Sequence, residues 1–237
     1  MRRQVLGVGV DFLGAEQAEE RLHAFLAGGT HLVATANAEM LFRAARDPKL
    51  AAALAAADLV LPDGAGVVLA GRLLGYGRFP RLPGVELAEA LLAEGHPTFL
   101  LGGRPGVAAA AAEHLVERHR AVRVVGTAHG YFTKDEEPAV LDAVRRASPA
   151  LLLVGLGSPR QERWLVAHRE ALAVPLAMGV GGALDVFAGR VPRAPAWMGR
   201  VGLEWLFRLA AQPRRWRRSL VLPAFVWAVL RERGKGR

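Results

Sequence analysis

Asp63 lies at the end of an apolar run, between a proline and a glycine, in the segment LVLPDGAGVV (59–68). A carboxylate in that position has two uses. As a helix N-cap it accepts a hydrogen bond from a backbone N–H of the helix that follows. As a general base it removes a proton from a substrate hydroxyl. The two roles are compatible, and the segment by itself favours neither.

A second pair of polar side chains, Thr35 and Asn37, follows another apolar run in TANAEML (35–41). Residues two apart point to the same side of an extended segment, so we expect both side chains to contact a ligand. Asn37 is equally suited to cap the helix that follows, and that alternative stays open.

Glycine-rich segments follow three further apolar runs. They are LLGGRPG (100–106), VGLGSPRQE (154–162) and GVGGALD (179–185). Glycines let backbone N–H groups approach phosphate oxygens, and the start of a helix favours anions. The candidate phosphate contacts are Gly102, Gly103, Gly155 and Gly157. Arg160 stands where the third glycine of a dinucleotide fingerprint is needed, and no P-loop motif is present, which disfavours both of these site types.

Two polar segments complete the set of candidate contacts. In GSPRQERW (157–164), Pro159 suits a first helical turn and places Gln161 and Glu162 at the helix start. The Gln161 amide both donates and accepts hydrogen bonds, which suits a uracil edge or sugar hydroxyls. In GRFPRLPGVEL (77–87), Arg81 lies in a Pro/Gly-rich loop that we expect to close over a diphosphate. For both segments, solvated surface charge is the alternative interpretation.

Metal and thiol chemistry find no support in the sequence. The chain has no cysteine, its seven histidines are scattered, and neither H-E-x-x-H nor a D-x-D pair occurs. We therefore expect no metal ion and no other cofactor.

Short apolar runs alternate with helix-like stretches along the first three quarters of the chain. The predicted strands are 4–10, 31–37, 57–61, 97–103, 122–127, 150–157 and 175–182. The predicted helices are 15–27, 38–46, 65–74, 105–119, 135–147 and one beginning near Pro159. Fully apolar strands separated by helices predict an α/β fold, a Rossmann-like parallel sheet with helices on both faces. In such sheets ligands bind beyond the carboxyl ends of the strands. Several candidates converge there: Asp63, Thr35, Asn37 and the glycines of the three glycine-rich segments.

The positive charge is concentrated at the C-terminus. Of 31 Lys and Arg residues, 12 lie in residues 190–237, which hold only 2 of the 22 acidic residues. We divide the chain into a catalytic domain, 1–190, and a basic, amphipathic helical appendage, 191–237. Arginines and tryptophans beside an apolar face suit a helix lying on an anionic membrane surface. A core-packing helix with a solvated basic face, or a nucleic-acid contact, is the alternative.

Taken in order, the motifs resemble the WecG/TagA/CpsF glycosyltransferases over nearly the whole chain. The motifs are TANAEML, LVLPDGAGVV, LPGVEL, FLLGGRPGVAAAAA, VGTAHGYF, LLVGLGSPRQERW, GVGGALDVFAGRVPRAPAWM and GLEWLFRLAAQPRRWRR. The resemblance implies an inverting, metal-independent enzyme that moves N-acetylmannosamine, or a related hexose, from a UDP-sugar. The implied acceptor is a polyprenyl-diphosphate-linked sugar, such as undecaprenyl-diphosphate GlcNAc, in teichoic acid or cell-surface polysaccharide synthesis.

The resemblance also implies roles for single residues. Asp63 becomes the base, Thr35 and Asn37 contact acceptor or donor sugar, and Arg81 holds a phosphate. Gln161 and Glu162 are placed among the substrate contacts. Relatives carry an aspartate where this chain has Glu86, so Glu86 receives no role. From the charge asymmetry we further expect tail arginines, notably Arg214 and Arg217, to neutralise the departing UDP.

Several expectations concern the setting of the protein. No apolar run is long enough to cross a bilayer, so we expect a cytoplasmic protein held peripherally at the inner face of the cell membrane. A nucleotide-dependent oxidoreductase and a non-enzymatic membrane- or nucleic-acid-binding module are the rival classes. The broken glycine fingerprint disfavours the first, and the polar rim disfavours the second. We expect no nucleic-acid partner, and the sequence leaves a homo-oligomer open.

Overall fold

The computed structural model describes residues 1–192, 195, 198, 207 and 221–235. The strands are β1 (Arg2–Val5), β2 (Val8–Asp11), β3 (His31–Ala36), β4 (Leu59–Pro62), β5 (Pro97–Gly102), β6 (Arg123–Ala128), β7 (Leu151–Gly155) and β8 (Leu176–Gly179). The helices are α1 (Ala15–Leu26), α2 (Ala38–Ala44), α3 (Pro48–Ala55), α4 (Ala65–Leu73), α5 (Gly84–Ala93), α6 (Val107–Arg118), α7 (Glu137–Ala147), α8 (Arg160–Ala167), α9 (Arg169–Leu172), α10 (Ala183–Phe187) and α14 (Val221–Lys235).

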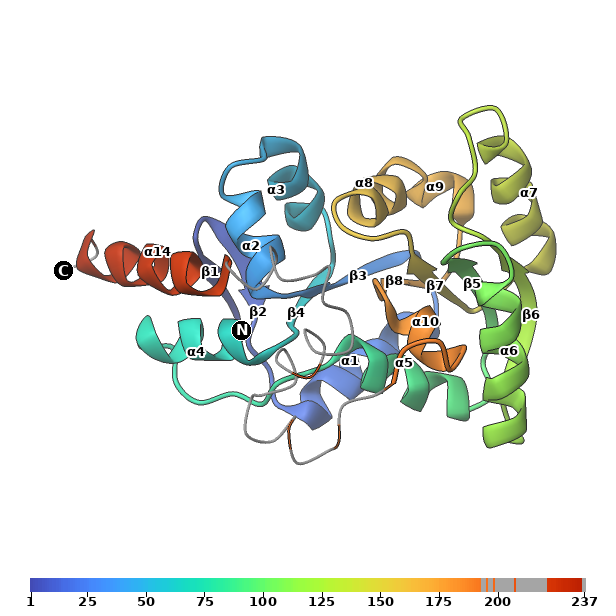
Figure 1. Ribbon diagram of the computed structural model, residues 1–237, viewed down its shortest axis with the longest axis horizontal. Coiled ribbons are helices and arrows are strands. Elements are labelled where there is room, and N and C mark those ends of the chain that lie inside the picture. The colour runs from blue at the N-terminus through green and yellow to red at the C-terminus, as the bar shows by residue number, and fades with distance from the viewer. Residues whose placement is uncertain (193–194, 196–197, 199–206, 208–220, 236–237) are drawn as a thin grey trace.

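Six strands form one parallel sheet in the order β4-β3-β8-β7-β5-β6 (Figure 1). Helices α2, α3, α7, α8 and α9 lie on one side of it, and α1, α5, α6 and α10 lie on the other. Because both faces are covered, the inner strands are mainly apolar and do not alternate apolar with exposed polar residues. The predicted α/β fold with helices on both faces is confirmed.

The first predicted strand, 4–10, is wrong as a member of this sheet. Leu6 and Gly7 both have positive φ angles, 52° and 77°, which makes a tight turn and folds residues 2–11 into the antiparallel hairpin β1–β2. The hairpin covers the outer edge of the sheet, since the Asp11 carboxylate accepts a hydrogen bond from the Val60 N–H of β4 at 2.8 Å. A period-two apolar run cannot distinguish one strand from two short ones.

Two of the longer helices, of 8 and 10 residues, were not expected from the sequence. Helix α3 begins after Asp47, whose carboxylate accepts from the Leu50 N–H at 3.1 Å, a cap signal that the sequence contains. Helix α5 begins at Gly84, inside the segment 77–87 that was interpreted as a loop throughout. The loop ends at Pro83 because proline suits the entry to a helix.

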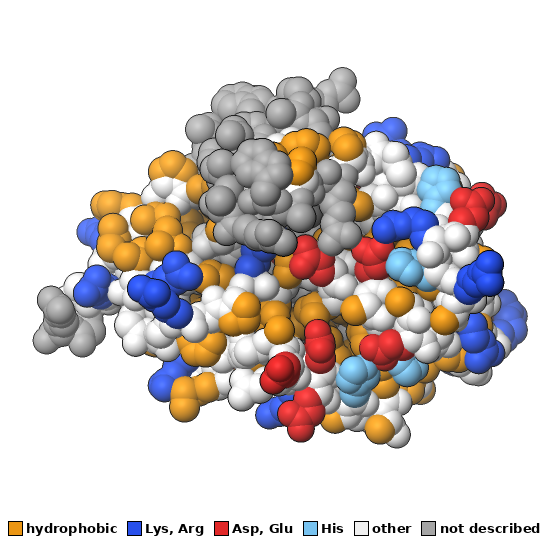
Figure 2. Space-filling model, turned by 90° about the horizontal axis from the view of Figure 1, so that it is seen from below, with side chains coloured by type: hydrophobic (Ala, Val, Ile, Leu, Met, Phe, Trp, Pro, Cys, Tyr) orange, Lys and Arg blue, Asp and Glu red, His pale blue; other side chains and the backbone are white. Residues whose placement is uncertain are grey.

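The C-terminal helix α14 packs against α2 and α4. Phe225 and Val229 have no exposed surface and join the apolar cluster formed by the hairpin, α2 and α4. The opposite side of α14 leaves Trp227 59% and Leu230 45% exposed. Figure 2 shows hydrophobic and basic side chains next to one another at the end of the molecule where α14 lies. Among the described helices, none is long and apolar enough to cross a membrane.

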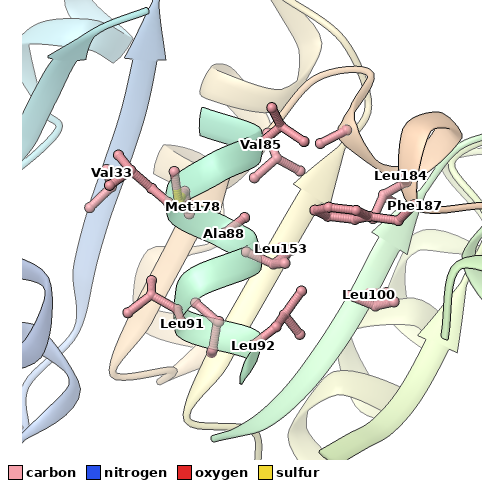
Figure 3. Close-up of a cluster of buried hydrophobic side chains, with 14 of the residues drawn as sticks. Val33, Val85, Ala88, Leu91, Leu92, Leu100, Leu153, Met178, Leu184 and Phe187 are labelled. Carbon is pink, nitrogen blue, oxygen red and sulfur yellow. The ribbon is translucent and has the colours of Figure 1, made fainter. Parts of the chain in front are cut away.

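The face of the sheet that faces α5 carries the largest apolar cluster (Figure 3). Val85, Ala88 and Leu92 of α5 lie on strands β3, β8, β7 and β5, and Phe187 of α10 closes the far side. Close packing of this kind fixes the strand ends against one another to within small displacements. The rim at the carboxyl ends of the strands is therefore built on a rigid floor.

Candidate active site

The carboxyl ends of five neighbouring strands form a continuous rim. In the order β4, β3, β8, β7 and β5 it carries Asp63, Asn37, Gly179–Gly182, Gly155–Gly157 and Gly102–Gly103. Four inter-strand spacings of about 4.8 Å separate its two ends, which gives a length of about 19 Å. Such a rim is long enough for an extended ligand and places Asp63 at one end of it.

Asp63 immediately follows β4 and is partly exposed. Its backbone N–H donates to the Ala36 carbonyl at 2.8 Å, which holds this segment beside the end of β3. The N-cap of α4 is Gly64, at φ 98°, which has no side chain to cap the helix. For Asp63, both the capping role and the general-base role stay predictions.

Arg81 lies beside the same strand end. The next residue, Leu82, donates its N–H to the Pro62 carbonyl at 3.0 Å, so the loop carrying Arg81 is tied to the segment carrying Asp63. The Arg81 side chain is 19% exposed, with its guanidinium 3.6 Å from the Glu86 carboxylate. The backbone that carries Arg81 therefore lies beside the segment that carries Asp63, at one corner of the rim.

Thr35 and Asn37 have different environments despite their spacing. The Thr35 side chain is buried, and its hydroxyl donates to the Gly179 carbonyl at 3.0 Å. A Cβ on Gly84 would lie 2.8 Å from that hydroxyl, so helix α5 covers Thr35. Asn37 is exposed and caps α2, accepting from the Met40 N–H at 2.9 Å. Capping uses Oδ1 of Asn37, while its contact with a ligand stays a prediction.

Gln161 and Glu162 are interior residues, only 2% and 4% exposed. Gln161 Nε2 donates to Glu162 Oε1 at 2.7 Å, and Gln161 Oε1 accepts from the Gly181 N–H at 3.1 Å. Burial raises the pKa of the Glu162 carboxyl above its ordinary value, while the hydrogen bond from Gln161 acts in the opposite direction. The solvated surface position considered for these two side chains is wrong, because α8 turns its first residues inward beneath the turn after β8.

The chain connections diverge between β5 and β7, because β5 leads outward to β6 whereas β7 leads back to β8. A crevice is expected at such a point. At this point the two strand ends contact each other through backbone atoms. The Gly103 N–H donates a hydrogen bond to the Gly155 carbonyl at 3.2 Å. A Cβ atom on Gly102 would lie 2.5 Å from the same carbonyl oxygen. The glycines are thus required for close approach of two strand ends.

Replacing Gly102 by alanine should destabilise the protein by at least about 3 kcal/mol, because strain at φ 147° adds to a clash with backbone that cannot move. The matched control is Gly157→Ala. Gly157 also has a positive φ, 77°, but a Cβ there meets nothing within 4 Å, so about 1 kcal/mol is expected. Urea denaturation measures both, and equal losses would contradict the close approach.

Comparison with known proteins identifies the family to which this sequence belongs. The sequence matches the family described as "Glycosyl transferase WecG/TagA/CpsF family" over residues 3–237. The chain belongs to the WecG/TagA/CpsF family. It is 36% identical over 203 residues, covering 84% of this chain and 78% of the relative, to the N-acetylglucosaminyldiphosphoundecaprenol N-acetyl-beta-D-mannosaminyltransferase of Bacillus spizizenii. It is 30% identical over 227 residues, 94% of this chain and 85% of the relative, to the protein of the same name from Bacillus subtilis.

Membership of the WecG/TagA/CpsF family makes the chain a glycosyltransferase. The predicted family resemblance and enzyme class are confirmed. An oxidoreductase and a non-enzymatic binding module, the two rival classes, are set aside by the same match, which covers both the rim and the C-terminal region.

Tyr131 of this WecG/TagA/CpsF protein lies next to the β5 end of the rim and was not singled out from the sequence. Tyr131 is 65% exposed in the turn after β6, next to Gly130, whose N–H donates to the Gly103 carbonyl at 2.8 Å. Arg160 holds this turn by donating to the carbonyls of Gly130 at 2.6 Å and Phe132 at 3.3 Å. The available signal was an aromatic residue directly after a glycine in VGTAHGYF.

The remaining expectations about this family member concern the tail and metals. Arg214 and Arg217 lie outside the described residues. In the part of the chain that the structure describes, no three His, Asp or Glu side chains are grouped so as to hold a metal ion.

Proposed function

We propose that this glycosyltransferase transfers N-acetylmannosamine from a UDP-sugar to an N-acetylglucosamine unit carried on undecaprenyl diphosphate. The observation that carries the proposal is the match to two relatives whose names state that sugar and that acceptor, over 84% and 94% of this chain. The rim supports it, because a partly exposed carboxylate, an arginine and backbone amides lie along one edge of the sheet. These groups suit a hydroxyl nucleophile and a diphosphate leaving group.

The reaction is a single displacement centred on Asp63. The carboxylate takes the proton from an acceptor hydroxyl as the oxygen attacks the anomeric carbon of the donor, and the bond from that carbon to the UDP oxygen breaks on the opposite face. Inversion at the anomeric carbon follows from one displacement. The negative charge that develops on UDP needs arginine and backbone N–H partners. Arg81 is one candidate for this role, because its loop is hydrogen-bonded to Pro62 beside Asp63.

The length of the rim suggests how the donor lies. Its anomeric carbon must be near Asp63, at the β4 end, so the nucleotide extends along the rim toward β5. There α6 begins at Val107, after the N-cap Gly106, which has no side chain to cap the helix. The N–H groups of a helix start favour phosphate oxygens. The exposed ring of Tyr131 stands beside Gly130 at the same end and suits stacking on a base.

Tyr131→Ala should therefore raise KM for the donor more than it lowers kcat.

Donor and acceptor are tested together by measuring UDP release and product mass from a panel of UDP-sugars with a short-chain GlcNAc-diphosphate lipid. The expected result is product only from UDP-N-acetylmannosamine or a close relative. Equal turnover in EDTA is expected, since the proposed mechanism uses no metal. Product from another UDP-sugar, with none from UDP-N-acetylmannosamine, would replace the proposed donor.

We infer further that the protein meets an anionic membrane surface, at the inner face of the cell membrane, through the outward side of α14. Trp227 and Leu230 project from that side, and the Arg231 guanidinium lies 4.3 Å from the Trp227 ring centroid. Leu69 of the adjacent helix α4 is also 42% exposed. Apolar and basic side chains together (Figure 2) are what an interfacial helix presents to lipid.

The double substitution Trp227→Ser and Leu230→Ser should weaken binding to vesicles containing anionic lipid at least about 10-fold, because each buried large side chain contributes about 1.5–3 kcal/mol. Co-sedimentation of the full chain with vesicles measures it. Val116→Ser is the control, since Val116 is a similarly exposed apolar residue, 48%, on helix α6 at the other end of the molecule. Unchanged binding of the double variant would remove α14 from the membrane surface.

A further inference from the structure

The Gln161 amide is oriented by its two neighbours. Its oxygen faces a donor, the Gly181 N–H, and its nitrogen faces an acceptor, Glu162 Oε1. An amide turned the other way would place its NH₂ group against a backbone N–H and its oxygen against a carboxyl oxygen. Glu162 therefore fixes the direction in which Gln161 can hold the turn after β8.

That turn occupies the middle of the rim. Gly179, where it begins, accepts the Thr35 hydroxyl from one side. From the other side Gln161 leaves no space, because a Cβ on Gly179 would lie 2.9 Å from Gln161 Nε2. The turn is thus held between β3 and α8, with Asn37 at the end of one neighbouring strand and Gly155–Gly157 at the end of the other.

Burying the Glu162 carboxyl also lowers the stability of the fold. Glu162 is 4% exposed, and its Oε2 atom makes no hydrogen bond of good geometry, although the Ser158 side chain is close enough to lower the pKa of the carboxyl against the larger, raising effect of burial. A buried polar atom without a partner costs about 1–3 kcal/mol. Residues that cost stability and yet remain in a well-packed interior are expected where function requires them.

We propose that Glu162 is a positioning residue of the transferase: through the Gln161 amide it holds the Gly179–Gly182 turn in the place where the donor sugar and phosphates cross the rim. The proposal rests on the proposed function for the identity of the ligand, but not for the geometry of the turn. Glu162 touches no substrate in this scheme, and its effect reaches the reacting atoms only through Gln161 and the turn.

The test replaces Glu162 by methionine, which keeps an unbranched chain of similar size and removes the acceptor. Misplacement of a rim segment should lower kcat about 10- to 100-fold. The free energy of unfolding should stay equal or rise, since an apolar side chain replaces a buried carboxyl group. Glu162→Gln retains an acceptor oxygen for Gln161 and should restore the rate to within about 5-fold of the wild type. Glu170→Gln, at an exposed site on α9, is the control.

If Glu162 had only a structural role, Glu162→Met would lower both the free energy of unfolding and kcat. If Glu162 is a positioning residue, the substitution lowers kcat without lowering the free energy of unfolding. Wild-type kcat in Glu162→Met would overturn the proposal, and so would a Glu162→Gln rate as low as that of Glu162→Met. Glu162→Leu is a second apolar replacement if the methionine variant does not fold.

Hydrogen exchange keeps this test separate from the proposed activity. The peptide spanning residues 176–184 contains the Gly181 N–H, and its exchange should be faster in Glu162→Met than in the wild type, because the amide partner is no longer held. If the wild type transfers no sugar from any donor, the proposed function fails while this exchange difference still tests the positioning. Unchanged exchange would overturn the positioning itself.

Discussion

Asp63→Asn should lower kcat at least about 100-fold, the usual contribution of general-base catalysis. Asparagine has nearly the same shape as aspartate but accepts no proton at neutral pH. The loss should fall on kcat rather than on KM, since proton transfer takes place only in the transition state. Steady-state UDP release with saturating donor and acceptor measures it.

The structure supplies controls for this experiment. Because asparagine keeps the size and shape of aspartate, Asp63→Asn should leave the protein folded, and the midpoint of thermal unfolding checks that a slow variant is still folded. Asp135→Asn, at an exposed loop position, removes one carboxylate elsewhere and should leave kcat unchanged. A near-normal rate for Asp63→Asn would require another base and would end the mechanism proposed above.

Phe225→Ala should cost about 3–5 kcal/mol of unfolding free energy, as for other fully buried phenylalanines. Its ring has no exposed surface and packs in the cluster shared by the hairpin, α2 and α4. The matched control is Trp227→Ala on the same helix. Trp227 is 59% exposed, so its loss should cost less than about 1 kcal/mol. Urea denaturation without lipid compares the two.

This pair tests how the C-terminal region relates to the catalytic domain. Equal, small losses would mean that α14 is not packed as described, and the chain would then behave as a body with a separable tail. A larger loss of stability for Phe225→Ala than for Trp227→Ala also affects how truncated proteins are interpreted. Truncation at 190 would expose the same apolar cluster, so loss of activity in such a truncated protein would not by itself prove a role for the tail in catalysis.

The sequence by itself predicted the class of fold and the place of the rim. Predominantly apolar runs at 31–37, 97–103 and 150–157 are each short, end in glycine or polar residues and alternate with stretches of helical periodicity. These are local properties of the chain. The polar or glycine residue at each strand end is local as well. Parallel pairing then brings those ends to one edge whatever the strand order. For this reason Asp63 was placed correctly beyond the end of a strand.

Only the tertiary structure decided the order of the strands and the burial of the candidates. Strand order, which sets the separation of Asp63 from Gly102, depends on which distant segments pair. Gln161 is hidden because the turn after β8 lies over it, and Thr35 is hidden because α5 begins at Gly84. Phe225 is a core residue because α2 and α4 leave an apolar face that α14 covers. Each of these outcomes depends on a contact between segments far apart in the chain, and periodicity and spacing carry no information about such contacts.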